Sequence, residues 1–483
     1  MKKFLCGLLA VMFLFSVSEP VRVHAASNFT YTYNIWGRPT PSPDAYRVTA
    51  FLLGYDLGVG NFSNPQDLFI IDNLLYLVDT GNNRIVVIRA NEDDTHEVIQ
   101  TVTYAVMDGV PTAFNAPEGI FVKDTGHIWL ADTRNQRILR MDENWVVVQE
   151  ITRPAASQLL DTDDFLPSKL AVDFTGRLFV QVHHVNRGLM EFDRYGNFAV
   201  YMGAAPVHVS PIDQFWRTIA TQEQRERREI FIPTEYNNVN VDSEGFLFVT
   251  NTSPDVDSVR RLNAMGNDVL IRNGLFPIEG DVVYGNAVGI EGPSQFIDIA
   301  PLPNETFVAF DRVRGRIFAY DFQGNLLYVF GGVGQREGFF MEPAAIANMG
   351  LSLFALDSRT AAITRFDMTE YGLAISSALE LYRRGMYEES IYYWQEVLRM
   401  NGNFGLAYRG MGRAMLRQGN YRQAMHYFRI ERDSVGYGRA FGFFRRQWME
   451  DHFWMFALAL GALIIIPPVV KRALKIRREI AQS

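Results

Sequence analysis

A unit of about 50 residues recurs six times between residues 68 and 368, and it constrains this chain more than any other feature. Each unit opens with a short apolar strand, and in five of the six units that strand begins three residues after a proline. The strands begin at residues 68, 120, 170, 239, 296 and 346. Because one such unit cannot bury its apolar face alone, the regular period predicts repeated units that pack against one another.

Three further strands follow the first one in the complete unit. The second strand is aromatic and β-branched, as in Phe246–Val249, and such residues favour a pleated, packed surface. A third strand such as Arg84–Ile88 and a fourth such as Leu326–Phe330 each follow a tight polar turn. Four antiparallel strands, repeated six times, predict a mainly β chain folded as a six-bladed β-propeller. A pair of β-sandwiches would explain the strands but not the fixed period.

The two ends of the repeat region complement each other. Tyr46–Leu53 is typical of a fourth strand whose first three strands are missing, and the last unit ends near Asp367 without a fourth strand. We expect these segments to pair, because pairing closes the ring and removes an exposed strand edge. The predicted propeller spans residues 26–370.

The turns between the second and third strands share a motif. It is clearest in Asp79-Thr80-Gly81-Asn82-Asn83-Arg84 and in Asp132-Thr133-Arg134-Asn135-Gln136-Arg137. Weaker copies begin at Asp311 and Asp357, whereas units three and four depart from the motif. On these residues, about 300 residues of the chain resemble NHL repeats. The resemblance implies a six-bladed propeller but no particular activity, because binding proteins and a few enzymes share that fold.

The same turns supply the first candidate binding residues. In a propeller blade, the loop between strands two and three lies on the same face as the segment leading into the next blade, so both border one mouth, the default site for a ligand. A structural role stays open for the repeated Asp and Arg residues, because Asp caps tight turns and Arg ties blades together. The candidates at the mouth are Asp79, Asn82, Arg84, Asp132, Asn135, Arg137, His183, His184 and Asp311.

The long gap between units three and four predicts an inserted helix at about residues 211–232. Phe215, Trp216 and Ile219 would share one side of it, with Glu/Arg pairs on the other. Extra length in one repeat commonly marks a functional loop, so Trp216 and Arg217 complete the candidate binding residues. The alternative that the insertion only plugs or buttresses the ring stays open.

Histidine placement and charge limit the chemistry. Only His183 and His184 fall in a mouth loop, whereas a metal site needs three or four converging ligands. We therefore predict no cofactor and no metal, and calcium held by carboxylates at the ring's centre has no motif to support it. The net charge of −8 shows none of the basic excess that nucleic-acid binding requires, so no nucleic-acid partner is expected.

After Tyr371 the pattern becomes helical, and residues 381–387 return 34 residues later as residues 415–421. Trp394 likewise returns as Phe428. The segment 371–436 resembles tetratricopeptide repeats, in which Gly and Ala allow two helices to cross closely. Because two such units are fewer than the three that usually bury a core, we expect the pair to pack on the propeller or on a partner chain.

Both ends of the chain indicate export. Residues 1–25 have the two lysines, the apolar run and the small final residues of a secretory signal, and the chain's one cysteine, Cys6, lies inside it. Disulfides and thiolate chemistry are therefore excluded from the predicted mature chain. After a juxtamembrane segment, 437–452, residues 453–470 contain no charge and are long enough to span a bilayer. The tail 471–483 carries five basic residues within the first eight, which favours a cytoplasmic tail.

Together these features predict a single-pass protein of a bacterial cell membrane, with its bulk outside the cytoplasm. The leading hypothesis is a non-catalytic scaffold that binds protein partners, with a transporter-associated complex as one setting and a carbohydrate or other small ligand left open. The alternative is a lactonase- or lyase-type propeller enzyme with a metal in the central mouth.

Overall fold

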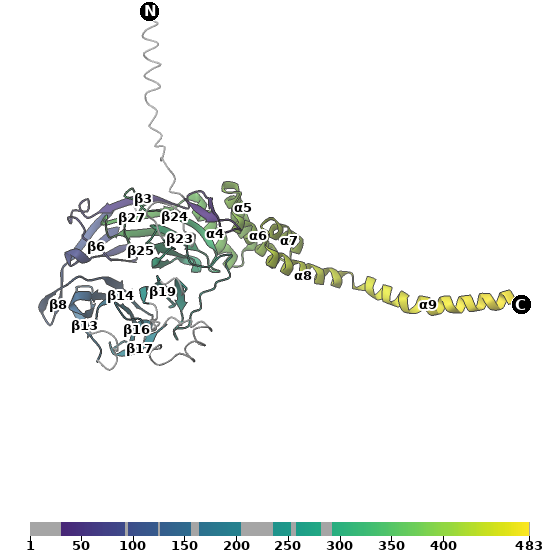
Figure 1. Cartoon of the computed structure of the whole chain (residues 1–483), viewed down its shortest axis with the longest axis horizontal. Helices are drawn as coiled ribbons and strands as arrows, with labels where there is room; N and C mark the ends of the chain where they lie inside the picture. The colour runs from purple at the N-terminus through teal and green to yellow at the C-terminus, as the bar shows by residue number, and fades with distance from the viewer. Residues whose placement is uncertain are drawn as a thin grey trace, which may run out of the picture.

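The computed structural model describes residues 30–91, 95–123, 126–155, 164–203, 235–252, 257–281 and 292–482. Within these ranges, six antiparallel sheets form a six-bladed β-propeller, six helices follow it, and the last helix projects from the folded body (Figure 1). The predicted signal segment, residues 1–25, and the predicted inserted helix, residues 211–232, lie outside the described residues.

Each blade is one sheet; the strands pair in chain order, except that β3 from the start of the chain completes the sixth blade. Blade one consists of β4 (Asp67–Ile71), β5 (Leu74–Asp79), β6 (Arg84–Ala90) and β7 (His96–Val102), and blade two of β10 (Gly119–Val122), β11 (Ile128–Asp132), β12 (Arg137–Met141) and β13 (Val147–Thr152). Blade three consists of β14 (Pro167–Val172), β15 (Leu178–Val182), β16 (Leu189–Phe192) and β17 (Phe198–Met202), and blade four of β18 (Tyr236–Val241), β19 (Leu247–Asn251) and β20 (Val259–Leu262). Blade five consists of β21 (Phe296–Pro301), β22 (Phe307–Asp311), β23 (Arg316–Tyr320) and β24 (Leu326–Gly331), and blade six of β25 (Pro343–Met349), β26 (Ser352–Asp357), β27 (Ala362–Met368) and β3 (Tyr46–Leu53).

The first strands form the inner wall of the ring. Each of β4, β10, β14, β18, β21 and β25 contacts the first strand of the next blade, and β25 contacts β4. The second strands β11, β15, β19 and β22 are buried along their whole length, because they pack against neighbouring blades on both faces. This explains why the sequence shows continuous apolar runs there rather than strict alternation.

Blade four differs from the predicted four strands. Within the described residues it has three, and a single bridge between Leu262 and Asp268 stands where the fourth strand would begin. The Asp268 carboxylate accepts hydrogen bonds from the backbone N–H groups of Arg261 and Leu270, at 3.1 and 3.0 Å. The Asp268 side chain thus accepts backbone hydrogen bonds of the kind that a fourth strand would accept.

The predicted closure of the ring is confirmed. Strand β3 pairs with β27 along its length, from Tyr46 opposite Met368 to Leu53 opposite Ala362. Tyr46 is fully buried and stacks on Phe330, with ring centroids 5.0 Å apart. The last blade therefore takes its outer strand from the N-terminal side of the ring.

Two short hairpins were not predicted. Strands β1 (Tyr31–Tyr33) and β2 (Pro39–Pro41) extend the edge of blade five, and Tyr31 lies opposite Val329 of β24. Strands β8 (Tyr104–Met107) and β9 (Val110–Ala113) lie against blade two. Strands of three or four residues carry too short a pattern to be separated from loops by periodicity.

The helices form two antiparallel pairs followed by two longer helices. They are α4 (Glu370–Arg383), α5 (Tyr387–Met400), α6 (Gly405–Arg417), α7 (Tyr421–Ile430), α8 (Ser434–Asp451) and α9 (Phe453–Gln482). Gly385 and Gly419 follow the first helix of each pair with the same φ of +80°, a backbone conformation that glycine adopts without strain. The 34-residue repeat in the sequence therefore corresponds to two helical hairpins of the same design.

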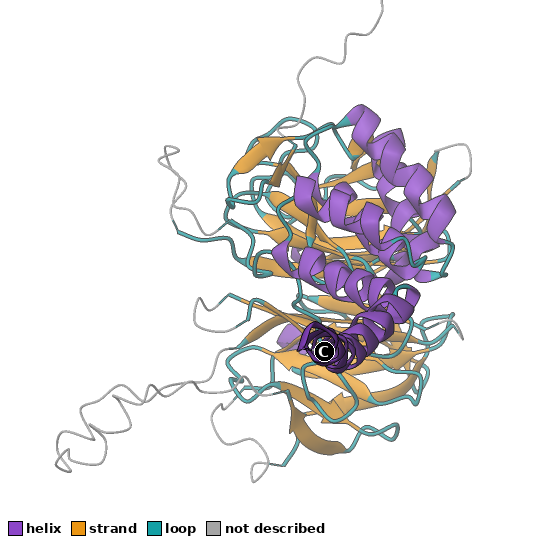
Figure 2. Cartoon of the chain, turned by 90° about the vertical axis from the view of Figure 1, so that its right-hand side faces the viewer, coloured by secondary structure: helices purple, strands orange, loops and turns teal. Residues whose placement is uncertain are grey.

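The helical region packs on the propeller, as its small size predicted (Figure 2). Tyr371, Ile375 and Trp394 share one buried cluster with Phe330 and Phe366 of the last two blades. The approach is close at Gly372, where a Cβ atom would lie 2.4 Å from the carbonyl oxygen of Ala45. The two parts therefore share a core rather than being joined by a free linker.

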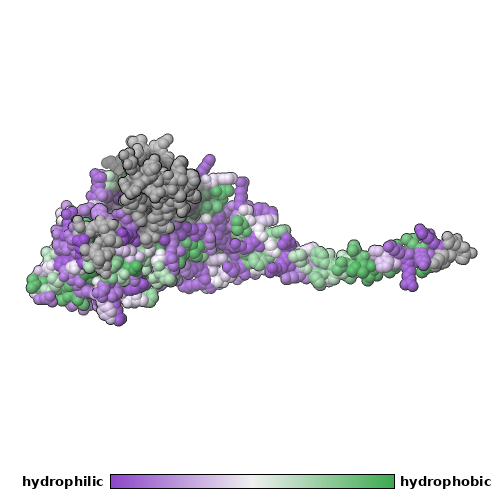
Figure 3. Space-filling model, turned by 60° about the horizontal axis from the view of Figure 1, so that its bottom comes forward, coloured by the Kyte–Doolittle hydropathy of each residue, from purple (hydrophilic) through white to green (hydrophobic). Residues whose placement is uncertain are grey.

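Helix α9 is long and apolar enough to cross a membrane over Phe453–Arg478, and none of its most apolar window is buried (Figure 3). The sequence predicted a span of residues 453–470 with a separate tail, whereas one helix runs on through Pro467 and Pro468. A proline inside a helix removes one N–H donor and crowds the carbonyl four residues earlier, yet the helix continues past both prolines.

We expect Tyr46→Ala to destabilise the propeller by about 3–5 kcal/mol, because it opens a cavity in the strand that closes the ring. Thr49→Ala in the same strand removes only an exposed hydrogen bond to Asp367 and should cost less than about 1 kcal/mol. Urea unfolding of both variants measures the difference. Equal costs would show that Tyr46 does not anchor the closure.

Candidate functional site

The Asp-x-x-Asn-x-Arg turns of blades one and two have the same internal contacts. Asp79 is fully buried and accepts hydrogen bonds from Asn82 at 2.8 Å and from the Arg84 Nε at 2.6 Å. Asp132 accepts from Asn135 and from the Arg137 Nε, both at 2.8 Å. Each aspartate also accepts the backbone N–H of a residue in the segment that leads into its own blade.

The threonine of each turn ties its blade to the next one. Thr80 donates to the carbonyl of Pro117 at 2.6 Å, and Thr133 donates to that of Pro167 at 2.8 Å. The expected sharing of one face by these turns and the leading segments is therefore seen in the structure. Asp311 is likewise buried and accepts hydrogen bonds from Ser294 and Gln295.

These contacts use the polar atoms of the turn residues to hold the fold. Asp79, Asp132 and Asp311 are fully buried, so the surface that they could offer to a ligand is small. Their assignment as binding residues stays a prediction, and so does that of Trp216 and Arg217, which lie outside the described residues.

The mouth residues of blade three form a different arrangement. The His183 Nε2 lies 2.6 Å from the Glu118 carboxylate, which also accepts the Ser168 hydroxyl at 2.9 Å. The His184 backbone N–H donates to Glu235 at 2.9 Å. Glu118, Ser168 and Glu235 were missed in the sequence, although Glu118 and Ser168 occupy the same place in the repeat, directly after a proline.

The two partners shift each other's ionisation in opposite directions. The hydrogen bond to Glu118 raises the pKa of His183, although burial works against it. Burial alone would raise the pKa of Glu118, but the hydrogen bonds from His183 and Ser168 hold it below its usual range. The contact therefore favours the imidazolium form of His183 and the carboxylate form of Glu118 at the rim of the mouth.

Below the rim, one residue of each first strand stands at the same register position. In every blade, this residue lies opposite the next-to-last residue of the second strand. We call this set the channel ring; its members are Asp67, Gly119, Lys169, Asn238, Asp298 and Ala345.

The polar members of the channel ring bond to one another across the blades. The Lys169 Nζ donates to Asp67 at 2.6 Å, and the Asn238 side chain donates to Asp298 at 2.5 Å. Each aspartate also accepts a backbone N–H from the next blade, that of Ile120 or of Ile346. Burial raises the pKa of Asp298 to about 7, although Lys169 acts against this. The channel ring thus holds ionisable groups inside the propeller, where charge is costly.

The sequence pattern did not indicate Asp298, because the matching part of the first strand in blade five lies three residues further from its proline than in blade one. Phe296 follows Pro293 by three residues, as Leu68 follows Pro65, but the strand pairing makes Ile299 the counterpart of Leu68. The spacing after proline was therefore misleading in this blade. Among the described residues, no three His, Asp or Glu side chains lie together so that they could hold a metal ion.

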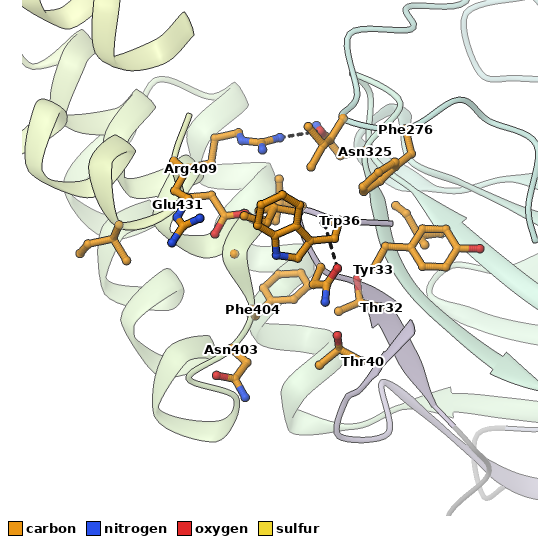
Figure 4. Close-up of a pocket in the computed structure, with 18 residues that line it drawn as sticks. Thr32, Tyr33, Trp36, Thr40, Phe276, Asn325, Asn403, Phe404, Arg409 and Glu431 are labelled. Atoms are coloured by element: carbon orange, nitrogen blue, oxygen red, sulfur yellow. Dashed lines mark hydrogen bonds between the residues drawn. The ribbon is translucent and has the colours of Figure 1, made fainter. Parts of the chain in front are cut away.

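A second concave feature lies where the propeller meets the helices (Figure 4). This junction pocket has a volume of about 350 Å³. Its walls come from the β1–β2 hairpin, residues 275–276, residues 325–326 at the start of β24, the α5–α6 loop with the first part of α6, and the end of α7 with the two residues after it. The labelled lining residues are Thr32, Tyr33, Trp36, Thr40, Phe276, Asn325, Asn403, Phe404, Arg409 and Glu431.

Both aromatic and charged groups line the junction pocket. Trp36 is 68% exposed at the tip of the hairpin, and the Arg432 guanidinium lies 5.8 Å from its ring centroid. Arg409 is buried, with its Nε 3.6 Å from the Asp433 carboxylate. Burial raises the pKa of Glu431, and Asp433 adds to this, while Arg409 opposes it. The pocket therefore offers an exposed aromatic surface beside ionisable groups.

No family model and no curated protein matches this chain. Among solved structures, it is similar to virginiamycin B lyase from Staphylococcus aureus, with 11% identity and a TM-score of 0.41 over 67% of this chain and 100% of the other. A protein of unknown function from Bacteroides thetaiotaomicron shares 11% identity, with a TM-score of 0.42 over 70% and 76%. A protein provisionally assigned as a gluconolactonase shares 11%, with 0.41 over 70% and 98%.

These likenesses, all with TM-scores below 0.5, carry no argument about function. The six-bladed architecture rests on the strand pairing of this chain, and the resemblances to NHL and tetratricopeptide repeats rest on its sequence.

Lys169→Met should destabilise the protein by about 3 kcal/mol, because it leaves the buried Asp67 carboxylate without its cation. Asp67→Asn combined with Lys169→Met should recover part of that loss, since no uncompensated charge remains. The exposed control Arg312→Met should change the free energy of unfolding by less than about 0.5 kcal/mol. Urea unfolding checks all three, and a Lys169→Met variant as stable as the control would contradict the charge argument.

The coupling between His183 and Glu118 should depend on pH in a defined window. Because folding raises the pKa of His183, its contribution to stability is fully present below the ordinary pKa of 6.5 and is lost as the pH rises through the folded-state pKa. Because folding lowers the pKa of Glu118, its contribution to stability is fully present above the ordinary pKa of 4.5 and is lost as the pH falls through the folded-state pKa. A double-mutant cycle with His183→Gln and Glu118→Gln should therefore show its largest coupling at about pH 5.5 and a smaller one above about pH 8. A coupling that is constant with pH would refute the ion pair.

Proposed function

We propose that this chain is a membrane-anchored binding protein that holds a protein partner at the outer surface of the cytoplasmic membrane. The observation that carries the proposal is α9, whose apolar side chains find no cover among the described residues of the protein. Leu463 and Ile464 in its middle are 73% and 63% exposed, which in water would be an aggregation liability and in lipid is not.

The orientation is supported by the two ends of the chain. The predicted signal at residues 1–25 would export the propeller behind it, and the basic residues after the apolar stretch, beginning with Lys471 and Arg472, favour the cytoplasmic side. With the tail inside, the propeller and the helices α4–α8 face outward. A transporter-associated complex is one setting that would use such an anchored platform.

The shared core of propeller and helices makes the junction pocket the preferred contact for the partner. Its walls belong to segments that are far apart in the sequence but fixed by the same packing, so the pocket is preformed. Trp36 offers a large aromatic surface at its edge, and Leu275 and Ile430, each 47% exposed, extend that surface. Exposed tryptophan beside apolar and charged groups is typical of the residues that dominate protein interfaces.

The enzyme alternative has no comparable support among the described residues. A lactonase- or lyase-type activity with a metal in the mouth would need converging ligands, and Glu118 with His183 supplies only two. Stoichiometric metal in the purified protein, lost on substitution of either residue, would overturn the binding proposal in favour of this alternative.

The chain offers a direct test, because the predicted mature protein has no cysteine. We expect Trp36→Cys and the control Tyr55→Cys, 76% exposed on blade six, both to react with a membrane-impermeant maleimide in intact cells. A photo-crosslinker attached at position 36 should then join a defined membrane protein, whereas one at position 55 should not. Labelling only after lysis would refute the orientation, and equal crosslinking at both positions would refute the junction pocket as the contact.

A further inference from the structure

Three blades of the propeller place an arginine over an aromatic ring at the same register position. Arg140 pairs with Trp129, Arg261 with Phe248, and Arg365 with Phe354, each across the second and third strands of its blade. The guanidinium lies 5.3, 5.7 and 5.8 Å from the respective ring centroid. The feature therefore belongs to the repeat, and the three copies can be compared directly.

Two of the three arginines have a carboxylate partner. The Arg261 Nε donates to Asp242 at 2.8 Å and its guanidinium also reaches Glu244 at 2.7 Å. The Arg365 Nε donates to Asp367 at 3.2 Å. No ion pair within the described residues involves Arg140, and its Nε is buried without a hydrogen-bond partner.

Blades two and four differ at one residue of the repeat that lies close to this arginine. Asp242 follows the first strand of blade four, where its backbone N–H bonds to residue 246 and its carbonyl accepts from Gly245. Lys123 occupies the same place in blade two, with the same bonds to residue 127 and from Gly126. Lys123 thus occupies the position that Asp242 has in blade four. Blade two therefore brings Lys123 and Arg140 together, whereas in blade four Asp242 neutralises Arg261.

Among the described residues, the lining of the cavity at this position includes one lysine and two arginines but no carboxylate. It lies between blades two and three, on the face opposite the mouth, and has a volume of about 520 Å³. We call it the basic cavity; its lining residues are Lys123, His127, Trp129, Arg140, Val172, Gly176, Arg194 and Tyr195. The corresponding cavity between blades four and five, about 410 Å³, is lined by Asp242, Glu244 and Glu305 as well as by Arg261.

The contacts of Lys123 and Arg194 in the basic cavity are, within the described residues, to neutral groups. Lys123 donates to the backbone carbonyl of Asp173 at 3.2 Å, and the Arg194 guanidinium lies 4.7 Å from the ring centroid of Tyr195. The Arg194 Nη2 also donates to the Tyr195 hydroxyl at 2.6 Å, but a guanidinium has five N–H donors, so others remain for an anion. Like charges gathered without a counterion raise the free energy of the folded state, and a bound anion would lower it.

We propose that the basic cavity binds a phosphate group, either free or carried by a larger molecule. One ammonium and two guanidinium groups match a tetrahedral anion with several oxygens and up to two charges better than a single carboxylate. The volume also leaves room for a glycerol or sugar attached to the phosphate. This site lies on a different face from the mouth, and it stands whether or not the junction pocket holds a protein.

The test compares phosphate with chloride at equal ionic strength, using the full-length protein in detergent. We expect phosphate to raise the Tm by roughly 2–4 °C, because a ligand that binds only the folded state stabilises it. Lys123→Asp, which restores the residue type of blade four, should raise the Tm without phosphate and lose the phosphate response. Arg134→Asp makes the same change of charge on the opposite face of blade two and should keep that response.

Two further arms secure the result and identify the source of the phosphate. Lys123→Met removes the charge without adding an acid and should also lose most of the shift. Glycerol phosphate in solution should reproduce the shift if the ligand is soluble, whereas a shift seen only in phosphatidylglycerol nanodiscs would assign the site to a lipid headgroup. A phosphate response that persists in Lys123→Asp, or one that Arg134→Asp abolishes equally, would overturn the proposal.

Discussion

The pairing of β3 with β27 is the contact on which the rest of this structure depends. It joins the first and last parts of the propeller, so that all six blades have a neighbour on each side. It also fixes where the two remaining parts of the chain begin. The segment before β3 reaches back to blade five as the β1–β2 hairpin, and the segment after β27 continues at once into α4. The junction pocket exists because these two segments start from adjacent strands.

The closure and the period of the ring could be predicted from the sequence, because both rest on strong local patterns. Tyr46–Leu53 is an outer strand without a blade of its own, and the last unit lacks an outer strand after Asp367. Pairing these two segments satisfies both requirements. The requirement that two helical hairpins find cover was predictable for the same reason, since their exposed apolar face had to be buried.

The channel ring and the junction pocket could not be predicted in the same way. Asp298 became the counterpart of Asp67 only through the pairing of β21 with β22, which the position of Pro293 had obscured. Trp36 owes its place to a hairpin of three-residue strands, in which the Asn34 side chain bonds to the backbone N–H groups of Trp36 and Arg38. Such contacts depend on three-dimensional register rather than on residue spacing. The motif residues, by contrast, were easy to find but turned out to be occupied with holding the turns.

The direct passage from β27 into α4 has a mechanical consequence. Any pull on the C-terminal helix reaches the propeller at Met368, beside the seam that closes the ring. Before that tension could open the seam, it would have to peel α4 and α5 from the aromatic cluster around Phe330 and Phe366. The packing of α4 and α5 therefore shields the closing strand pair from tension applied at α9. In the membrane-anchored protein that we propose, forces on that helix would reach the aromatic cluster before they reach the closed ring.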